Sequence, residues 1–189
     1  MIPHVFGIGH PRSGGHSLSL ALNLIGIKSL HFGLDKTEGG THAKAMYARY
    51  ASNQDPIVDY GDYAALVDWP LWHVWESIKY YHADSMFILT TRNPYNAALS
   101  WMRLMHRVPV EDVLRDGLQT SIAEVAESYL RHQDRVMHSF LYSPSKLLVI
   151  DTEDAQDTKL SRLCNFLGVD PPENVIYPTN EDTSVINKT

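Results

Sequence analysis

Short apolar runs alternate along the chain with longer segments in which apolar residues recur at helical spacing. The short runs predict strands near residues 4–9, 28–32, 85–91 and 146–151, with a weaker candidate near 56–59. The longer segments predict helices over residues 15–26, 41–52, 71–81, 94–106, 110–142 with a break near Gly117, and 157–167. Strands that alternate with helices predict an α/β fold in three layers, a parallel sheet flanked by helices.

The first predicted strand runs directly into a glycine-rich turn and a helix. Residues 4–8 are mostly apolar, and Gly9–Gly15 allow backbone N–H groups to converge before the leucine-rich helix begins. Unpaired N–H groups and the positive end of a helix dipole favour an anion, and Arg12 adds a positive charge. This pattern predicts a phosphate cradle; the alternative is an ordinary turn whose glycines satisfy turn geometry alone.

The turn is close to the phosphate loop of nucleoside-triphosphate enzymes, G-x-x-x-x-G-K-[S/T], but does not complete it. Gly9 and Gly14 have the correct spacing. Gly15 stands where the phosphate-binding lysine belongs, and His16 stands where the magnesium-binding hydroxyl belongs. A kinase or ATPase is therefore disfavoured.

A second strand-to-helix segment spans residues 85–105. Its strand ends at Arg92, and the helix that follows is predicted to be capped by Asn93 with Pro94 in the first turn. Because ligands bind outside the carboxyl ends of parallel strands, Arg92 is expected in the same crevice as Arg12.

The helix of this segment carries polar residues at spacings of four and three. Asn96, Ser100 and Arg103 are expected on one face. A guanidinium at Arg92 and a hydroxyl at Ser100 suit a phosphate monoester. The alternative is a strand-end arginine paired with a surface carboxylate and a serine packed in a helix.

Both segments resemble motifs of sulfotransferases. Residues 11–17, Pro-Arg-Ser-Gly-Gly-His-Ser, resemble the loop that holds the 5′-phosphosulfate of the donor, 3′-phosphoadenosine 5′-phosphosulfate (PAPS). Arg92 and Ser100 match the arginine and the serine eight residues later that hold the 3′-phosphate in this family. The resemblance implies a P-loop-like fold, a PAPS-dependent transferase and 3′,5′-bisphosphoadenosine (PAP) as product.

The chain departs from the family loop at two positions. Gly15 and His16 replace a pair of hydroxyl residues, so contacts to the 5′-phosphate fall to Ser13, Ser17 or the backbone. The implied cofactor-binding residues are Arg12, Ser13, Gly14, Gly15, His16, Ser17, Arg92 and Ser100. The tryptophan that stacks on adenine in the steroid and phenol branch is replaced by Ser17, and that branch's Arg-Lys-Gly loop is missing, which leaves the adenine pocket unassigned.

The catalytic base implied by the resemblance is Asp68. Val67-Asp68-Trp69-Pro70 is similar to the Asp-x-Pro element that precedes the 3′-phosphate strand in small sulfotransferases, and Arg12 is the implied partner of the departing phosphate. A carboxylate within hydrogen-bond reach can accept the proton of an acceptor hydroxyl. An N-cap for the helix over residues 71–81 is the structural alternative for Asp68. His10, His16 and His31 are rival bases.

Length and composition agree with a single domain over residues 1–189. The resemblance spans residues 3–181, and 44% apolar content over 189 residues supports one sizeable core.

A net charge of −6 without a basic block disfavours nucleic acid as a partner. The lack of an apolar stretch of about 18 residues and of a signal-like start predicts a soluble cytoplasmic protein without a membrane span. The single Cys164 is predicted to be core, and no ligand spacing predicts a metal.

The acceptor is open at this stage: a small molecule, a lipid or a carbohydrate. Five aromatic residues are candidates either for an apolar acceptor cleft or for the core: Tyr60, Tyr63, Trp69, Trp72 and Trp75. Two other functions also stay open. A kinase with a degenerate phosphate loop would use the strand that ends at Asp151 to bind magnesium, and a catalytically silent nucleotide-binding module would fit the departures at Gly15 and His16.

Overall fold

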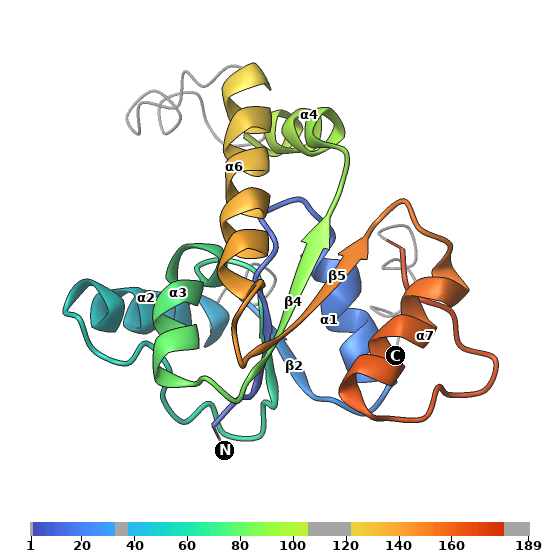
Figure 1. Ribbon diagram of the computed structural model, residues 1–189, viewed down its shortest axis with the longest axis horizontal. Helices are drawn as coiled ribbons and strands as arrows, with labels where there is room; N and C mark the ends of the chain where they lie inside the picture. The colour runs from blue at the N-terminus through green and yellow to red at the C-terminus, as the bar shows by residue number, and fades with distance from the viewer. Residues whose placement is uncertain (1, 33–37, 106–121, 180–189) are drawn as a thin grey trace.

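The computed structural model describes residues 2–32, 38–105 and 122–179 and has five parallel strands in the order β2-β3-β1-β4-β5 (Figure 1). The strands are β1 (Val5–Gly7), β2 (Ser29–His31), β3 (Ala65–Val67), β4 (Met86–Thr91) and β5 (Lys146–Asp151). The described helices are α1 (Gly15–Leu24), α2 (Glu38–Ala51), α3 (Leu71–Tyr81), α4 (Pro94–Met105), α6 (Ile122–Phe140) and α7 (Gln156–Leu167). The predicted α/β class is confirmed.

Two hydrophobic cores cover the two faces of the sheet, because successive side chains of a strand point to opposite faces. On one face Phe6, Leu66 and Phe87 pack with side chains of α2, α3 and α6. On the other face Val5 and Ile88 pack with side chains of α1 and α7. Figure 1 shows α2 and α3 on one side of the strands and α1 and α7 on the other. This is the predicted three-layer arrangement.

The fifth strand was predicted in the wrong place. Residues 56–59 form a loop, and the strand is Ala65–Val67, which pairs with both β1 and β2. Ile57 explains the error: its side chain is buried in the core, but its backbone N–H donates to Asp55 Oδ1 at 2.9 Å. An apolar side chain in a core loop gives the same sequence signal as a short buried strand.

The other predicted elements match within a few residues at their ends. The strand over residues 146–151 and the helix over residues 71–81 have the predicted bounds. The long predicted helix is described over Ile122–Phe140, and the break near Gly117 lies outside the described residues. Cys164 is fully buried, as predicted, and burial raises the pKa of its thiol.

The carboxyl ends of the five strands meet at one edge of the sheet. His31 ends β2, Asp68 follows β3, and Arg92 follows β4. The glycine-rich turn of residues 9–14 leaves β1 at the centre of the sheet, between β3 and β4. Thr152 follows β5, and its N–H donates to Thr91 O at 2.9 Å. The topology therefore gathers residues from the ends of all five strands at one edge of the sheet.

Candidate active site

The turn between β1 and α1 is anchored to β4 through Ser13. The Ser13 hydroxyl is fully buried and donates to His10 O at 2.6 Å, while its oxygen lies 2.8 Å from Thr90 Oγ1. Gly9 makes this close approach possible, since a Cβ there would collide with Thr90 Oγ1 and Ser13 Oγ. Ser13 therefore shapes the turn from within, and its hydroxyl does not face a cavity.

The first turn of α1 presents backbone donors to the sheet edge. Gly14 precedes the helix with a φ of 101°, in the left-handed region that favours glycine. The first intrahelical bond joins Leu18 N to Gly14 O at 3.0 Å, so the N–H groups of Gly15, His16 and Ser17 precede it. Converging N–H groups at the positive end of a helix favour an anion, and phosphate binding at this turn stays a prediction.

Arg12 stands at the tip of this turn in an unusual backbone conformation. Its φ of 72° lies in the left-handed region, which is uncommon for residues other than glycine. Its Nε donates to Ser100 Oγ on α4 at 2.9 Å. The two phosphate motifs are thus joined through Arg12 and Ser100.

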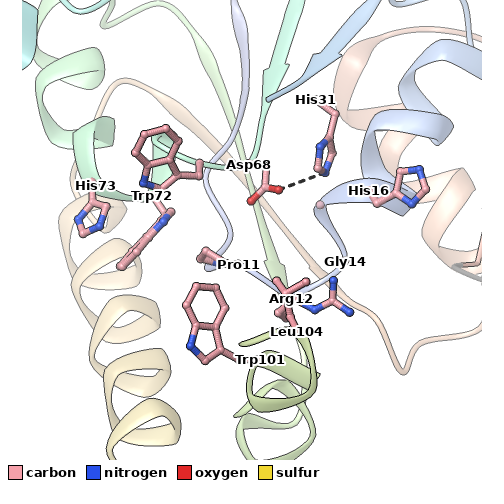
Figure 2. Close-up of a pocket in the computed structure, with 12 residues that line it drawn as sticks. Pro11, Arg12, Gly14, His16, His31, Asp68, Trp72, His73, Trp101 and Leu104 are labelled. Atoms are coloured by element: carbon pink, nitrogen blue, oxygen red, sulfur yellow. Dashed lines mark ion pairs between the residues drawn. The ribbon is translucent and has the colours of Figure 1, made fainter. Parts of the chain in front are cut away.

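A cavity of about 700 Å³ opens beside this turn (Figure 2). Its walls come from the turn, the ends of β2 and β3, and helices α3 and α4. The lining residues are Pro11, Arg12, Gly14, Gly15, His16, His31, Asp68, Trp69, Trp72, His73, Trp101 and Leu104. Arg12 and Asp68 supply the formal charges of this lining, and indole and imidazole rings make up much of the rest.

Asp68 projects into this cavity from the end of β3. Its Oδ2 lies 3.3 Å from His31 Nε2, the interaction drawn as a dashed line in Figure 2. Its φ of 81° is again left-handed, and such strained residues cluster at functional sites. The N-cap interpretation of Asp68 is wrong: α3 is preceded by Pro70 and has no side-chain cap, because the Asp68 carboxylate turns toward β2 instead.

The three rival bases differ in their access to the cavity. His10 is 7% exposed beneath the turn, with its ring 4.5 Å from that of Trp72, and burial lowers its pKa to about 4. His16 and His31 both line the cavity, and burial lowers the pKa of each below the usual value. A lowered pKa favours the uncharged form of each imidazole.

A second cavity, of about 220 Å³, lies on the other side of Gly14. Its lining residues are Gly14, Ser17, Arg92, Asn96, Thr152, Glu153, Lys159, Tyr177, Pro178 and Thr179. Arg92 lines this second cavity and Arg12 the first, and the two adjoining cavities share Gly14. The predicted Asn93 cap of α4 is confirmed, since Asn93 Oδ1 accepts from the N–H groups of Tyr95 and Asn96.

Comparison with known families agrees with this geometry. A family model described as a sulfotransferase domain matches residues 4–114 and, in an overlapping second segment, residues 94–186. The chain belongs to the sulfotransferase family. A search of curated proteins finds no match to it. The resemblance drawn from the two phosphate motifs is therefore confirmed at the level of the family, whose activity is the transfer of a sulfuryl group.

The structure of this sulfotransferase divides the predicted aromatic residues between cavity and core. Trp69 and Trp72 line the larger cavity, whereas Trp75 is fully buried and Tyr60 is 4% exposed in the core. Trp101 was missed. It comes from α4, directly after Ser100, and its place in the sequence after a predicted phosphate ligand is the signal that could have found it.

Lys159 and Thr152 were also missed in the smaller cavity of the sulfotransferase. Lys159 is on α7, far along the chain from either phosphate motif, and no sequence spacing links it to them.

Among the described residues no group of three or more His, Cys, Asp or Glu side chains is placed to hold a metal ion. No helix within the described part of the chain is long and apolar enough to cross a membrane.

Proposed function

We propose that this sulfotransferase uses PAPS as donor and transfers its sulfuryl group to a hydroxyl or amine of an uncharged acceptor in the larger cavity. One observation carries the proposal: Gly14 borders both cavities, with Arg12 and Asp68 in the larger one and Arg92 in the smaller one. A donor with phosphate groups at two positions of its ribose needs cations on both sides of a backbone phosphate cradle.

The residues around the cradle fit such a donor. The N–H groups of residues 15–17 and the N-terminus of α1 suit the 5′-phosphate. Gly14 leaves room where a Cβ would lie 2.6 Å from Thr152 Cγ2. Thr152 Oγ1 is buried without a hydrogen-bond partner among the described residues, so a ligand hydroxyl or phosphate oxygen would satisfy it.

The mechanism assigns one task to each of these side chains. When bound, the donor supplies a sulfuryl group attached to a phosphate that leaves with the nucleotide. Arg12, oriented by Ser100, stabilises the negative charge that develops on this phosphate. Asp68 accepts the proton of the acceptor hydroxyl, and His31, whose Nε2 lies 3.3 Å from Oδ2, positions the carboxylate. Arg92 binds the 3′-phosphate of the ribose.

The lining of the larger cavity supports an uncharged acceptor with apolar or flat surfaces. Trp69, Trp72 and Trp101 supply aromatic surface, and Leu104 adds an aliphatic one. A small-molecule or lipid acceptor fits such walls directly, and a carbohydrate would stack its apolar ring faces on the indoles.

Nucleotide binding tests the donor without knowledge of the acceptor. Isothermal titration calorimetry is expected to give PAP an affinity at least about tenfold higher than that of 5′-AMP, or about 1.4 kcal/mol. Arg92→Ala should remove most of the difference, while Arg131→Ala, which breaks an exposed ion pair with Glu127 on α6, should not. EDTA should change neither affinity. Equal affinities of the wild-type protein for PAP and 5′-AMP would overturn the proposed donor.

The kinase alternative gains no support from the strand that ends at Asp151. Asp151 Oδ2 accepts from Thr91 Oγ1 at 3.0 Å, and Oδ1 accepts from the Glu153 N–H at 2.8 Å. Both carboxylate oxygens are therefore engaged, and Asp151 lines neither cavity.

A further inference from the structure

The smaller cavity contains a second cation beside Arg92. Lys159, on α7, lines it although the residue is only 5% exposed. Its Nζ donates to Thr152 O at 2.9 Å and lies 5.2 Å from the centre of the Tyr177 ring. Burying an ammonium group has a large desolvation cost, so a lysine in this position calls for a negatively charged counterpart.

Nearby carboxylates have other partners or face solvent. Asp154 forms an ion pair with Arg162 at 3.0 Å, and Asp151 accepts from Thr91 and from a backbone N–H. Glu153 lines the cavity but is exposed. Burial lowers the pKa of Lys159 by more than the charges of Asp154 and Asp151 raise it, and no ion pair of Lys159 with either carboxylate forms among the described residues.

Thr152 provides an independent sign of a ligand at the same place. Its carbonyl accepts from Lys159, while its Oγ1 is buried without a partner among the described residues. A hydroxyl in this state loses hydrogen bonding on folding unless something else binds there. The ammonium of Lys159 keeps N–H donors beyond the one given to the carbonyl, so one ligand oxygen group could satisfy both residues.

We propose that Lys159 is the second cation of the ribose-phosphate site and binds the 3′-phosphate together with Arg92, with the Thr152 hydroxyl as a third donor. This assignment rests on the proposed PAPS donor. It gives the chain a substitute for the Arg-Lys-Gly loop that the sequence lacks, supplied by α7, which packs against β5.

Calorimetry on four variants tests the proposal by binding rather than by activity. Lys159→Met keeps the length and apolar stem of the side chain but removes its charge, and it is expected to weaken PAP binding at least about tenfold while 5′-AMP binding changes less than about twofold. Thr152→Val removes the hydroxyl at constant shape and should weaken PAP binding about threefold to tenfold. Arg92→Ala reports on the site as a whole.

Lys79→Met is the matched control for the loss of a partly buried lysine. Lys79 also donates to a main-chain carbonyl, that of Ser139, and lies 4.6 Å from the centre of an aromatic ring, that of Phe140, but it lines neither cavity. Its substitution should leave both nucleotide affinities unchanged. Thermal unfolding of each variant without nucleotide separates a loss of binding from a loss of fold.

The outcomes separate this proposal from the one on which it rests. If Arg92→Ala loses the preference for PAP over 5′-AMP and Lys159→Met keeps it, the Lys159 assignment is overturned and the donor stands. If the folded wild-type protein shows no such preference, the donor itself is overturned. Should Lys159→Met fail to fold, Lys159→Arg replaces it. A PAP preference that is retained in Lys159→Arg and reduced about threefold to tenfold in Thr152→Val supports the site, and an unchanged preference in Thr152→Val rejects it.

Discussion

The imidazole of His31 lies with Nε2 3.3 Å from Oδ2 of Asp68, at the adjacent ends of β2 and β3. Both residues where the phosphate loop departs from the family pattern pack against this pair. A Cβ at Gly15 would lie 3.7 Å from His31 Nε2, and the ring of His16 meets that of His31 edge-on at 5.6 Å. A Cβ at position 15 would therefore make ordinary van der Waals contact with His31 and Asp68.

Replacement of His31 should separate a positioning role from a role as the base. His31→Leu removes the polar side chain beside Asp68 and is expected to lower the rate of PAPS desulfation, measured with a panel of phenols, alcohols and amines, at least about tenfold. His31→Gln keeps an N–H near the position of Nε2 and should retain the rate within about threefold.

His82→Leu is the control for this experiment. His82 Nε2 lies 2.9 Å from Asp55 Oδ1, a histidine–carboxylate pair that lines neither cavity. Its loss should leave the desulfation rate unchanged. If His31→Gln is as slow as His31→Leu, His31 itself accepts the proton.

Asp68→Asn should lower the desulfation rate at least about a hundredfold with little change in stability. The amide cannot accept a proton at neutral pH, but asparagine tolerates the left-handed backbone at this position and no helix cap is lost. Asp68→Ala adds the strain of a left-handed alanine and should unfold at a lower temperature than Asp68→Asn. A rate near that of the wild type in Asp68→Asn would transfer the role of base to His31 or His16.

Arg12→Ala should lower the desulfation rate by roughly two to three orders of magnitude and weaken PAP binding much less. Charge on the departing phosphate is greatest in the transition state, so its loss affects the rate most. Arg12→Lys should retain part of the rate, although it cannot reproduce the Nε donation to Ser100 Oγ. Equal rates in wild type and Arg12→Ala would remove Arg12 from the mechanism.

Gly9→Ala should destabilise the fold by about 2 kcal/mol or more, because its Cβ would overlap the buried pair Ser13 and Thr90. Gly40→Ala is the control. A Cβ at Gly40 meets no atom within 4 Å, and alanine in α2 should stabilise the protein by up to about 1 kcal/mol. Chemical denaturation measures both. Equal stabilities of Gly9→Ala and wild type would contradict the tight packing of the turn.

Stability should fall as the pH is lowered from about 6.5 toward 4, in part because of His10. Burial lowers its pKa from 6.5 to about 4, so in this window the unfolded chain binds a proton that the native state does not. The contribution of His10 is at most about 3 kcal/mol. His10→Asn should flatten the fall in unfolding temperature between pH 7 and pH 5. An unchanged slope would show that His10 is solvated in the native protein.

Local patterns in the sequence predicted the elements and the phosphate-binding motifs, because helix periodicity, glycine turns and strand-end cations depend on neighbours in the chain. Four strands and the cap at Asn93 are present as predicted. The strand Ala65–Val67 was missed because Ile57, a buried apolar residue in a loop, drew the prediction to residues 56–59.

The sequence by itself determined the α/β class, the family, and the place of the glycine-rich turn before α1. Tertiary structure alone decided which distant residues meet: His31 with Asp68, Arg12 with Ser100, and Arg92 with Lys159 in a second cavity. Each pair joins separate segments of the chain near the carboxyl edge of the sheet, and their proximity follows from strand order rather than from any spacing along the chain.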